Sequence, residues 1–461
     1  MEQLKKNQKF NEEVIDLSYE GNGVVKCDGL VAFIPGVLVG ENVEGVIINA
    51  KSKFVVGKAQ NISNFSKDRV EPRCPYFLKC GGCQLQHLEY NAQLEFKRAQ
   101  VQRLLGDAVK IEKTVPSTEY RYRNKVALPV DENGNIGLYR QGSHNVIEVE
   151  DCAICKDFIK PLISASKEII KKGNKLKHVV CRSLSDKLMI TLVVKDKKDV
   201  NTTDVKNILD NYFKDYSLNL NINTLDNNVI LSDKFMNVYG DEQIKHKALD
   251  VVCNISNGSF FQVNQEISEA IYKKVLSVVD NNSVIIDCYS GTGLLTAILS
   301  KRAKKCYGIE IVESATNEAN KLKIENNILN MENINGDCKV VLPKIVGRLK
   351  DEKVNIVVDP PRKGLDKKVA QTILSVKPDK IVYISCNPAT LARDAQIFLD
   401  GGYSYAFAQT FDMFPQTSHV ETLCVFELKK DKKKQAAQNQ NFKSKYFGYY
   451  DDVKIASNDE W

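Results

Sequence analysis

Cys386 is the residue whose type and position best suit nucleophilic chemistry in this sequence. It follows a run of β-branched and aromatic residues at 381–384, which predicts a short buried strand, and Pro388 then stops the sheet. We expect Thr390 to be the N-cap of the helix that follows. Cys386 is thereby placed just past the carboxyl end of a strand, where open α/β sheets bind their ligands. Spacing alone slightly favours a buried structural thiol, one of 13 cysteines, whereas the neighbouring motifs favour a nucleophile.

One carboxylate is expected near this thiol, and another begins the last predicted strand. Asp359 ends the apolar strand predicted over 354–359, and two prolines follow it. Because Asp359 and Cys386 end successive strands at the same edge of a predicted parallel sheet, we expect both side chains to face one cavity. Glu421 begins the last strand of a hairpin predicted over 411–428, which closes the sheet.

A glycine-rich turn, Gly291-Thr292-Gly293, joins a predicted strand to a predicted helix. Glycines at such a turn let backbone N–H groups approach a nucleotide closely. About twenty residues further on, Glu310 ends the next predicted strand, where a carboxylate can bind ribose hydroxyls. Asp337 follows the third strand, where such folds often contact an adenine. The pattern indicates an adenosine-containing cofactor.

Three cysteines, Cys74, Cys80 and Cys83, lie within ten positions and are interrupted by two glycines. This spacing predicts a metal-binding loop. A fourth ligand is needed, and Cys152 and Cys155 are the two candidates. Spacing does not separate zinc from an iron–sulfur cluster. It does argue against a radical S-adenosylmethionine enzyme, whose cysteines follow the pattern C-x3-C-x2-C.

Aromatic and basic residues alternate in the segment EYRYRNK, from residue 119 to residue 125. In a strand, Tyr120 and Tyr122 would share one face, and Arg121, Arg123 and Lys125 the other. Such faces can stack a nucleic-acid base and hold phosphates. A solvated strand with a half-buried tyrosine face is an equally good interpretation.

The elements that position these residues fall into distinct patterns along the chain. Short apolar strands with glycine turns over 9–65 predict a small barrel, with lysines on one rim. Apolar residues at three- and four-residue intervals predict an amphipathic helix that ends near Gly106. A mixed α+β segment is expected over 130–250, and strand–helix repeats follow from 255. After Lys429 the composition is that of a solvated polar tail.

Length and composition restrict the class of protein. A chain of 461 residues suggests two to four domains, and a net charge of +7 suits a polyanionic partner such as RNA. No signal peptide and no membrane-spanning stretch is predicted. The odd number of scattered cysteines argues against a disulfide framework, and we expect a reducing cytoplasm.

Five ordered motifs resemble the RNA (uracil-5-)-methyltransferase family. They are FFQVN (260–264), DCYSGTG (287–293), DPPRKG (359–364), SCNPATLARD (385–394) and DMFPQTSHVE (412–421). The C-x5-C-x2-C loop resembles that of the members that carry a [4Fe-4S] cluster and modify 23S ribosomal RNA. The N-terminal segment resembles a TRAM domain, an OB-like RNA-binding module. The resemblance runs from about residue 10 to 428, with Ser290 at a position where many members have cysteine.

The resemblance implies a role for each candidate residue. Cys386 matches the nucleophile that attacks uracil C6, and Glu421 matches the base that removes the C5 proton. The residues that match S-adenosylmethionine contacts are Gln262, Tyr289, Glu310, Asp359 and Asp337. Those that match the cluster ligands are Cys74, Cys80, Cys83 and Cys152, which selects Cys152 over Cys155.

The fold expected from the resemblance is a Rossmann-like α/β methyltransferase domain with an N-terminal OB-like β-barrel and a mixed α+β central domain. We expect the barrel over 1–68, the central domain with the cysteine loop over 69–254, the catalytic domain over 255–428 and a polar tail over 429–461. Helix 88–106 is expected to pack on the catalytic domain, which would make the central domain discontinuous. We expect a monomer that binds no membrane.

Two rival functions remain open on the sequence. The same chemistry can act on the T-loop uridine of transfer RNA, against which the cysteine loop and the barrel weigh. A non-catalytic RNA-binding or redox-sensing iron–sulfur protein is the other alternative. The motifs do not distinguish members that modify one uridine from members that modify two.

Overall fold

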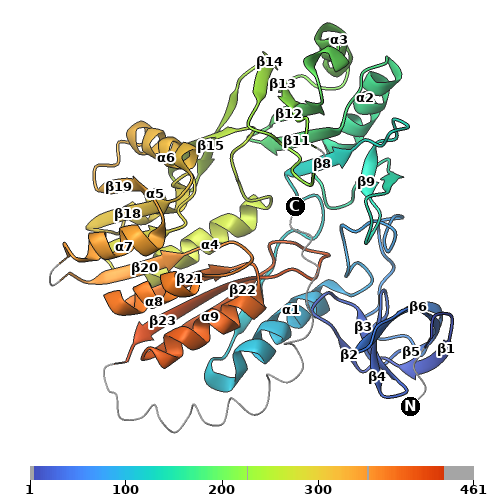
Figure 1. Ribbon diagram of the computed structural model, residues 1–461, viewed down its shortest axis with the longest axis horizontal. Helices are drawn as coiled ribbons and strands as arrows, with labels where there is room; N and C mark the ends of the chain where they lie inside the picture. The colour runs from blue at the N-terminus through green and yellow to red at the C-terminus, as the bar shows by residue number, and fades with distance from the viewer. Residues whose placement is uncertain (1–4, 226, 350–351, 430–461) are drawn as a thin grey trace.

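The computed structural model describes residues 5–225, 227–349 and 352–429. The polar tail expected over 429–461 lies outside the described residues, except for Lys429. Figure 1 shows the N-terminal strands in blue beside helix α1 (Tyr90–Leu105), the central strands in green, and the large C-terminal sheet in yellow to red.

The large sheet has eight strands in the order β19-β18-β17-β20-β21-β23-β22-β7. The first five are mutually parallel, and β23 runs antiparallel between β21 and β22. Apolar runs closed by glycine or proline form these short buried strands. Their bounds are β7 Glu112–Val115, β17 Val284–Cys288, β18 Lys305–Glu310, β19 Met331–Asn335, β20 Val354–Val358, β21 Lys380–Ser385, β22 Tyr403–Phe411 and β23 Glu421–Leu428.

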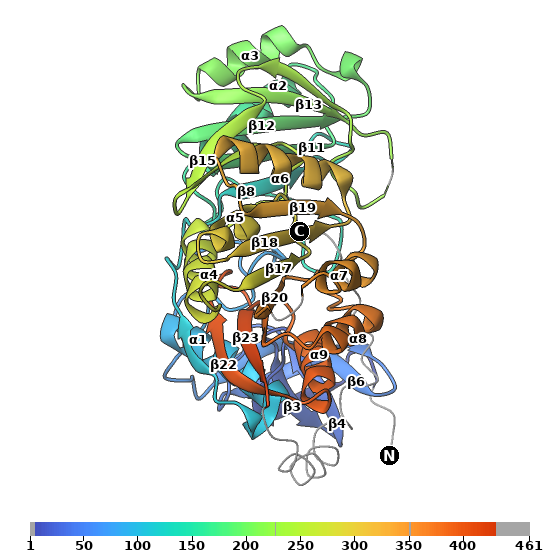
Figure 2. The same cartoon turned by 90° about the vertical axis from the view of Figure 1, so that its left-hand side faces the viewer.

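Helices cover both faces of this sheet, as Figure 2 shows from the side. One face packs against α4 (Gln265–Val278) and α5 (Leu294–Ser300). The other packs against α1 and three further helices, so α1 shares a core with elements far along the chain. These three are α7 Cys338–Val346, α8 Lys367–Val376 and α9 Pro388–Asp400, and α6 Glu313–Glu325 follows β18.

Six N-terminal strands form one sheet in the order β1-β5-β6-β4-β3-β2 around a core that includes Val25, Ile34 and Ile47. A second apolar cluster joins this sheet to α1, with Leu17 and Leu38 against residues that include Leu85 and Leu88. The strands are β1 Lys9–Glu13, β2 Asp16–Leu17, β3 Gly23–Cys27, β4 Leu30–Ile34, β5 Asn42–Ala50 and β6 Phe54–Ser63.

The central sheet has five strands in the order β14-β13-β12-β11-β8, and two helices share its core. Two two-stranded ribbons flank it. The helices are α2 Ile159–Lys171 and α3 Thr202–Asp210. The strands are β8 Lys125–Pro129, β9 Gly137–Tyr139, β10 Val146–Glu148, β11 His178–Leu184, β12 Lys187–Val194, β13 Tyr216–Ile222, β14 Phe235–Tyr239, β15 Gln243–Ala248 and β16 Val251–Ser256.

The prediction of a strand over 119–125 is wrong for most of these residues. Regular strand begins only at Lys125, and Arg121 has a left-handed φ of 57°, which breaks the predicted alternation of faces. Tyr122 is buried and donates its hydroxyl to Pro415 O at 3.1 Å. Arg121 forms an ion pair with Asp151 at 2.6 Å. These two side chains therefore join segments of the protein to one another.

The helix cap predicted at Thr390 is also wrong. Asn387 is the N-cap of α9, and its side chain accepts a hydrogen bond from Ala389 N. Pro388 occupies the first turn, where its fixed φ suits a helix start and its missing N–H costs nothing. The helix therefore begins immediately after the candidate nucleophile.

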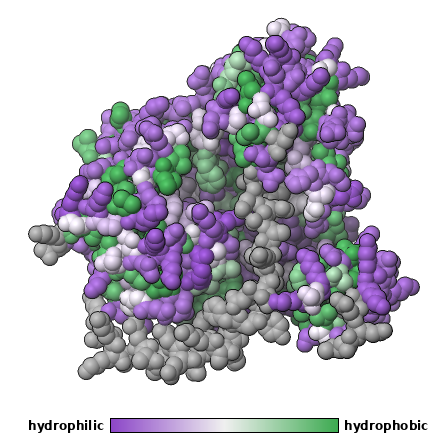
Figure 3. Space-filling model, in the orientation of Figure 1, coloured by the Kyte–Doolittle hydropathy of each residue, from purple (hydrophilic) through white to green (hydrophobic). Residues whose placement is uncertain are grey.

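In the described part of the chain, no helix is long and apolar enough to cross a membrane. On the face in Figure 3, apolar residues are scattered among hydrophilic ones. All 13 cysteines are free thiols.

Candidate active site

Three neighbouring strands bring one thiol and two carboxyl groups to a single edge of the large sheet. Asp359 follows β20 and Cys386 follows β21, its parallel neighbour. Glu421 is the first residue of β23, which pairs antiparallel with β21 so that Ser385 lies opposite Thr422. Cys386 is half-buried, whereas Glu421 is only 5% exposed. Of these two residues, Cys386 is thus the more exposed.

Burial raises the pKa of all three acidic groups. Burial, and then the charges of Glu421 and Asp359, raise the pKa of Cys386 to about 12. Burial and Asp359 hold the pKa of Glu421 well above its usual range, and burial raises the pKa of Asp359 to about 7. At pH 7 the Cys386 thiol therefore keeps its proton, whereas Asp359 is about half ionised. A cation that enters this acidic pocket would lower all three pKa values and favour the thiolate.

Arg362 is the basic group at this site, and sequence reasoning gave it no role. Its charge lowers the pKa of both Cys386 and Glu421. Its backbone carbonyl accepts hydrogen bonds from Asn387 Nδ2 at 3.1 Å and Thr390 Oγ1 at 3.2 Å. The residue thus ties the loop after β20 to the loop after β21. In the sequence, the only signal for such a role is the position of Arg362 in the DPPRKG motif, between two prolines and a glycine.

The glycine-rich turn after β17 is held by the carboxylate at the end of β18. Glu310 accepts hydrogen bonds from Gly291 N at 2.9 Å and from Val312 N at 2.8 Å. Gly293 has a φ of 79°, and a Cβ there would lie 2.6 Å from Ala319 Cβ. A side chain at that position would therefore clash with α6. Tyr289, in the same turn, has a φ of 66°.

The loop that carries Gln262 is fixed from the central part of the chain. Asn124 Nδ2 donates to Gln262 O at 3.0 Å. Asn264 caps α4, and its Nδ2 donates to Ser117 Oγ at 2.8 Å and to Met413 O at 3.2 Å. These contacts hold the loop without engaging the Gln262 side chain.

Asp337 lies at the N-terminus of α7 and is engaged by protein groups. Its carboxylate accepts a hydrogen bond from Lys339 N at 3.0 Å and pairs with Lys339 Nζ at 2.8 Å. The hydrogen bond and charge of Lys339 lower its pKa. The structure therefore gives Asp337 a capping role.

The thiols of Cys74, Cys80, Cys83 and Cys152 lie near one another, because the charges of the other three all act on the pKa of Cys83. Gly82 N donates to Cys80 Sγ at 3.4 Å. Within the described residues, however, no three His, Cys, Asp or Glu side chains are arranged to hold a metal ion.

The loop that carries Cys152 is positioned by Arg121. The guanidinium donates to Cys152 O at 3.0 Å and to Cys155 O at 3.2 Å, and it pairs with Asp151. Cys155 is 1% exposed, whereas Cys152 is half-buried. The charge of Cys152 acts on the pKa of Cys83. Arg121 thus supports the cysteine site.

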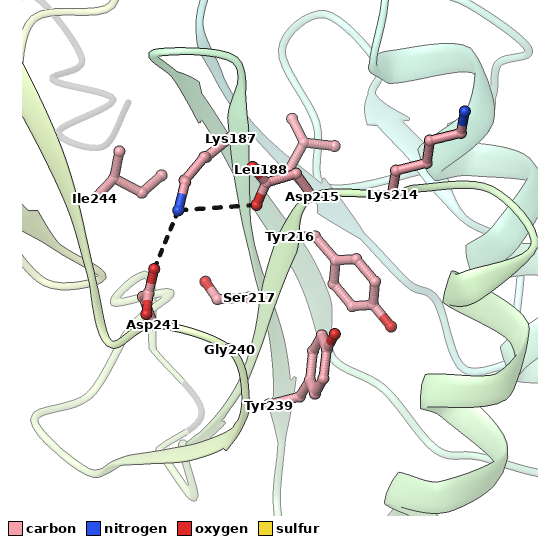
Figure 4. A pocket seen from close by; sticks show the side chains of 10 residues that line it. All are labelled: Lys187, Leu188, Lys214, Asp215, Tyr216, Ser217, Tyr239, Gly240, Asp241 and Ile244. Atoms are coloured by element: carbon pink, nitrogen blue, oxygen red, sulfur yellow. Dashed lines mark hydrogen bonds and ion pairs between the residues drawn. The ribbon is translucent and has the colours of Figure 1, made fainter.

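A separate cavity of about 140 Å³ lies in the central part of the chain (Figure 4). Lys187 Nζ in this cavity lies 3.2 Å from Asp241 Oδ2 and 3.9 Å from Asp215 Oδ1. The rings of Tyr216 and Tyr239 lie nearby with their centroids 5.2 Å apart and their planes tilted by 44°. None of the predicted site residues lines it, so it is not where the chemistry is expected.

Known proteins resemble this chain over most of its length. The model of a family described as tRNA (uracil-5-)-methyltransferase matches residues 89–430. An uncharacterized RNA methyltransferase of Staphylococcus aureus (strain MSSA476) is 39% identical over 457 residues, covering 93% of this chain and 100% of the relative. One of Clostridium tetani is 38% identical over 459 residues, covering 94% and 99%.

A solved structure is similar in both fold and sequence. It is the crystal structure of Pyrococcus abyssi tRNA (uracil-54, C5)-methyltransferase in complex with S-adenosyl-L-homocysteine. It aligns with a TM-score of 0.75 at 28% identity, and the alignment covers 90% of this chain and 99% of that one. The mixed α/β fold described above is thus that of an S-adenosylmethionine-dependent methyltransferase.

Proposed function

The chain belongs to the tRNA (uracil-5-)-methyltransferase family of S-adenosylmethionine-dependent RNA methyltransferases, and from this premise we propose that it methylates C5 of uridine in 23S ribosomal RNA through a covalent adduct. One observation carries the mechanism: Cys386, Glu421 and Asp359 meet at one edge of the large sheet. This set supplies a nucleophile, a proton acceptor and a carboxylate suited to a cationic donor.

The chemistry of uracil explains why both a thiol and a base are needed. C5 of uracil is a weak nucleophile on its own. Addition of the Cys386 thiolate to C6 converts C5 into the nucleophilic carbon of an enolate, which takes the methyl group. Glu421 then accepts the proton from C5, and the C6–S bond breaks to release the thiolate and the methylated base.

S-adenosylmethionine supplies an electrophilic methyl group on a positively charged sulfur. We propose that it is held by Gln262, Tyr289, Glu310 and Asp359. The acidic character of the site supports this assignment, because three groups at it share raised pKa values and would be stabilised by a cation. Asp337 is the fifth proposed contact, and its cap and lysine pair leave it the least free to reach a ligand.

We further propose that Cys74, Cys80, Cys83 and Cys152 hold a [4Fe-4S] cluster. The charges of Cys74, Cys80 and Cys152 all act on the pKa of Cys83, and this proximity of the four thiols supports the proposal. The donor set is entirely thiol, as such clusters require. The cluster would join the loop over 74–83 to the loop that Arg121 positions.

The proposed domain division follows from these assignments. Residues 1–68 form a TRAM domain that binds RNA, 69–254 the cluster-bearing central domain and 255–428 the catalytic domain. The packing of α1 on the large sheet supports the discontinuous central domain.

A tRNA uridine is the second candidate substrate. The Pyrococcus abyssi structure, of a tRNA (uracil-54, C5)-methyltransferase, aligns over nearly all of this chain. The resemblance of the cysteine loop supports ribosomal RNA instead. Unmodified 23S rRNA and tRNA transcripts, incubated separately with the protein and labelled S-adenosylmethionine, will show which RNA receives the methyl group.

Replacing the proposed nucleophile tests the mechanism directly. Cys386→Ala is expected to abolish methyl transfer while S-adenosylhomocysteine still binds. Cys181→Ala is the matched control, since it removes a buried thiol from the central sheet. Methylation by Cys386→Ala at the rate of this control would reject the covalent mechanism.

A further inference from the structure

A turn of the N-terminal sheet reaches the catalytic edge of the large sheet. Tyr19 lies in the turn between β2 and β3, and the charges of Arg362, Cys386 and Glu421 all act on its phenol. Burial, together with the charges of Cys386 and Glu421, raises the pKa of Tyr19 to about 12, and the charge of Arg362 opposes this rise. An aromatic side chain from the N-terminal sheet therefore lies within electrostatic range of the candidate nucleophile and base.

The turn that carries Tyr19 is rigid. Ser18 N donates to Asn22 O at 2.8 Å, and Gly21 N donates back to Ser18 O at 2.9 Å. Gly21 has a φ of 76°, and a Cβ on it would lie 2.8 Å from Leu85 Cδ2. The backbone on both sides of Tyr19 is thus fixed by its own hydrogen bonds and by close packing.

The same turn is anchored to the catalytic sheet through α1. Gln100 Nε2 on α1 donates to Ser18 O at 3.3 Å. Gln93 lies about two turns earlier on α1. It exchanges two hydrogen bonds, at 3.0 and 3.1 Å, with Gln416 in the loop before β23. Glu421 begins β23 five residues later. A continuous set of contacts therefore connects the position of Tyr19 to that of the proposed base.

The Tyr19 side chain does not serve this anchoring itself. Apolar docking between the two parts is provided by Leu17 and Leu38 against Leu85 and Leu88. Tyr19 is half-buried, and no hydrogen bond among the described residues engages its hydroxyl. A half-buried aromatic ring can stack on the flat face of a ligand, and ionisable groups near it can bind the polar edges of that ligand.

We propose that Tyr19 stacks on the target pyrimidine and holds it for attack by Cys386, so that the active site is incomplete without the N-terminal domain. This inference rests on the proposed function. A base that is modified by an enzyme leaves its helix and is gripped by aromatic side chains in the pocket. Tyr19 is a binding residue in this account, and its ring is the part that acts.

The test uses the full-length protein, the RNA transcript that the wild type methylates, and three variants. Tyr19→Ala is expected to lower kcat/KM roughly tenfold or more, whereas Tyr19→Phe keeps it within about threefold, because stacking needs only the ring. Asp16→Ala breaks the exposed ion pair with Arg103 at 2.9 Å in the same segment, and it should leave kcat/KM unchanged. The Kd for S-adenosylhomocysteine should be the same in all four proteins.

Three results would overturn the proposal. They are a wild-type kcat/KM in Tyr19→Ala, an equal loss in Asp16→Ala, which would indicate docking alone, and weaker S-adenosylhomocysteine binding in Tyr19→Ala. A wild-type protein that methylates neither transcript would instead reject the proposed function, and this inference with it.

Discussion

Lys97 Nζ on α1 lies 2.5 Å from Asp412 Oδ1, just after β22, and both side chains are fully buried. Lys97 also donates to Phe414 O at 3.0 Å. This ion pair joins residues more than three hundred positions apart in the chain. It fastens α1 to the loop that leads into Glu421.

Breaking this pair should destabilise the protein strongly. Asp412→Asn leaves a buried ammonium without its counter-charge, and we expect it to lower the free energy of unfolding by about 3–5 kcal/mol. Urea denaturation followed by circular dichroism measures the change. The control is Glu95→Gln, which breaks the exposed pair with Arg98 on the same helix and should cost no more than about 0.5 kcal/mol. Equal effects of the two substitutions would show that the buried pair adds nothing.

Removing the proposed base should trap the RNA on the protein. In Glu421→Gln the C5 proton cannot be taken, so the Cys386 adduct should persist after methyl transfer. The expected result is a slower band on a denaturing gel that depends on both RNA and S-adenosylmethionine. Glu427→Gln, at the exposed end of the same strand, should form no such band. A Glu421→Gln variant that turns over normally would assign the base to another residue.

The affinity for S-adenosylmethionine should increase with pH. The pKa of Asp359 is about 7, so its anionic form predominates above pH 7 and is lost as pH falls below it. If only the anion binds the sulfonium well, the association constant rises roughly tenfold between pH 6 and pH 8. Calorimetric titration measures this rise. Asp359→Asn should remove it, and S-adenosylhomocysteine, which lacks the sulfonium charge, should show little of it.

The cluster proposal assigns different roles to two neighbouring cysteines, Cys152 and Cys155. Cys152→Ser should lose iron, whereas Cys155→Ser should keep it, at about four iron atoms per chain when purified without oxygen. Mass spectrometry of the iron content provides the measurement. Equal iron content in both variants would show that Cys152 is not the fourth ligand. Absence of iron from the wild-type protein would reject the cluster proposal.

Part of the active site followed from local sequence signals. Apolar runs that end at proline or glycine predict where β20 and β21 end, and parallel strands place their carboxyl ends together. Asp359 and Cys386 were therefore expected side by side, and the pairing of these strands confirms it. The cap at Asn387 is also a local signal, since proline favours the first turn of a helix, and the prediction of Thr390 is wrong because it places the helix start after that proline.

Other features depend on contacts between distant residues. Arg121 takes a left-handed conformation because its N–H bonds to Ala153 O at 3.0 Å, a partner that no local pattern reveals. Tyr19 reaches Cys386 only because the N-terminal sheet docks on α1, and α1 docks on the large sheet.

The sequence by itself determined the strand ends, the family motifs and the cysteine loop, because each depends on residues close together in the chain. Only the tertiary structure decided that an arginine joins two motif loops and that a tyrosine from the first twenty residues comes within electrostatic range of the proposed nucleophile. The physical reason is that burial and the charges around a group depend on the packing of distant segments, which no local spacing encodes.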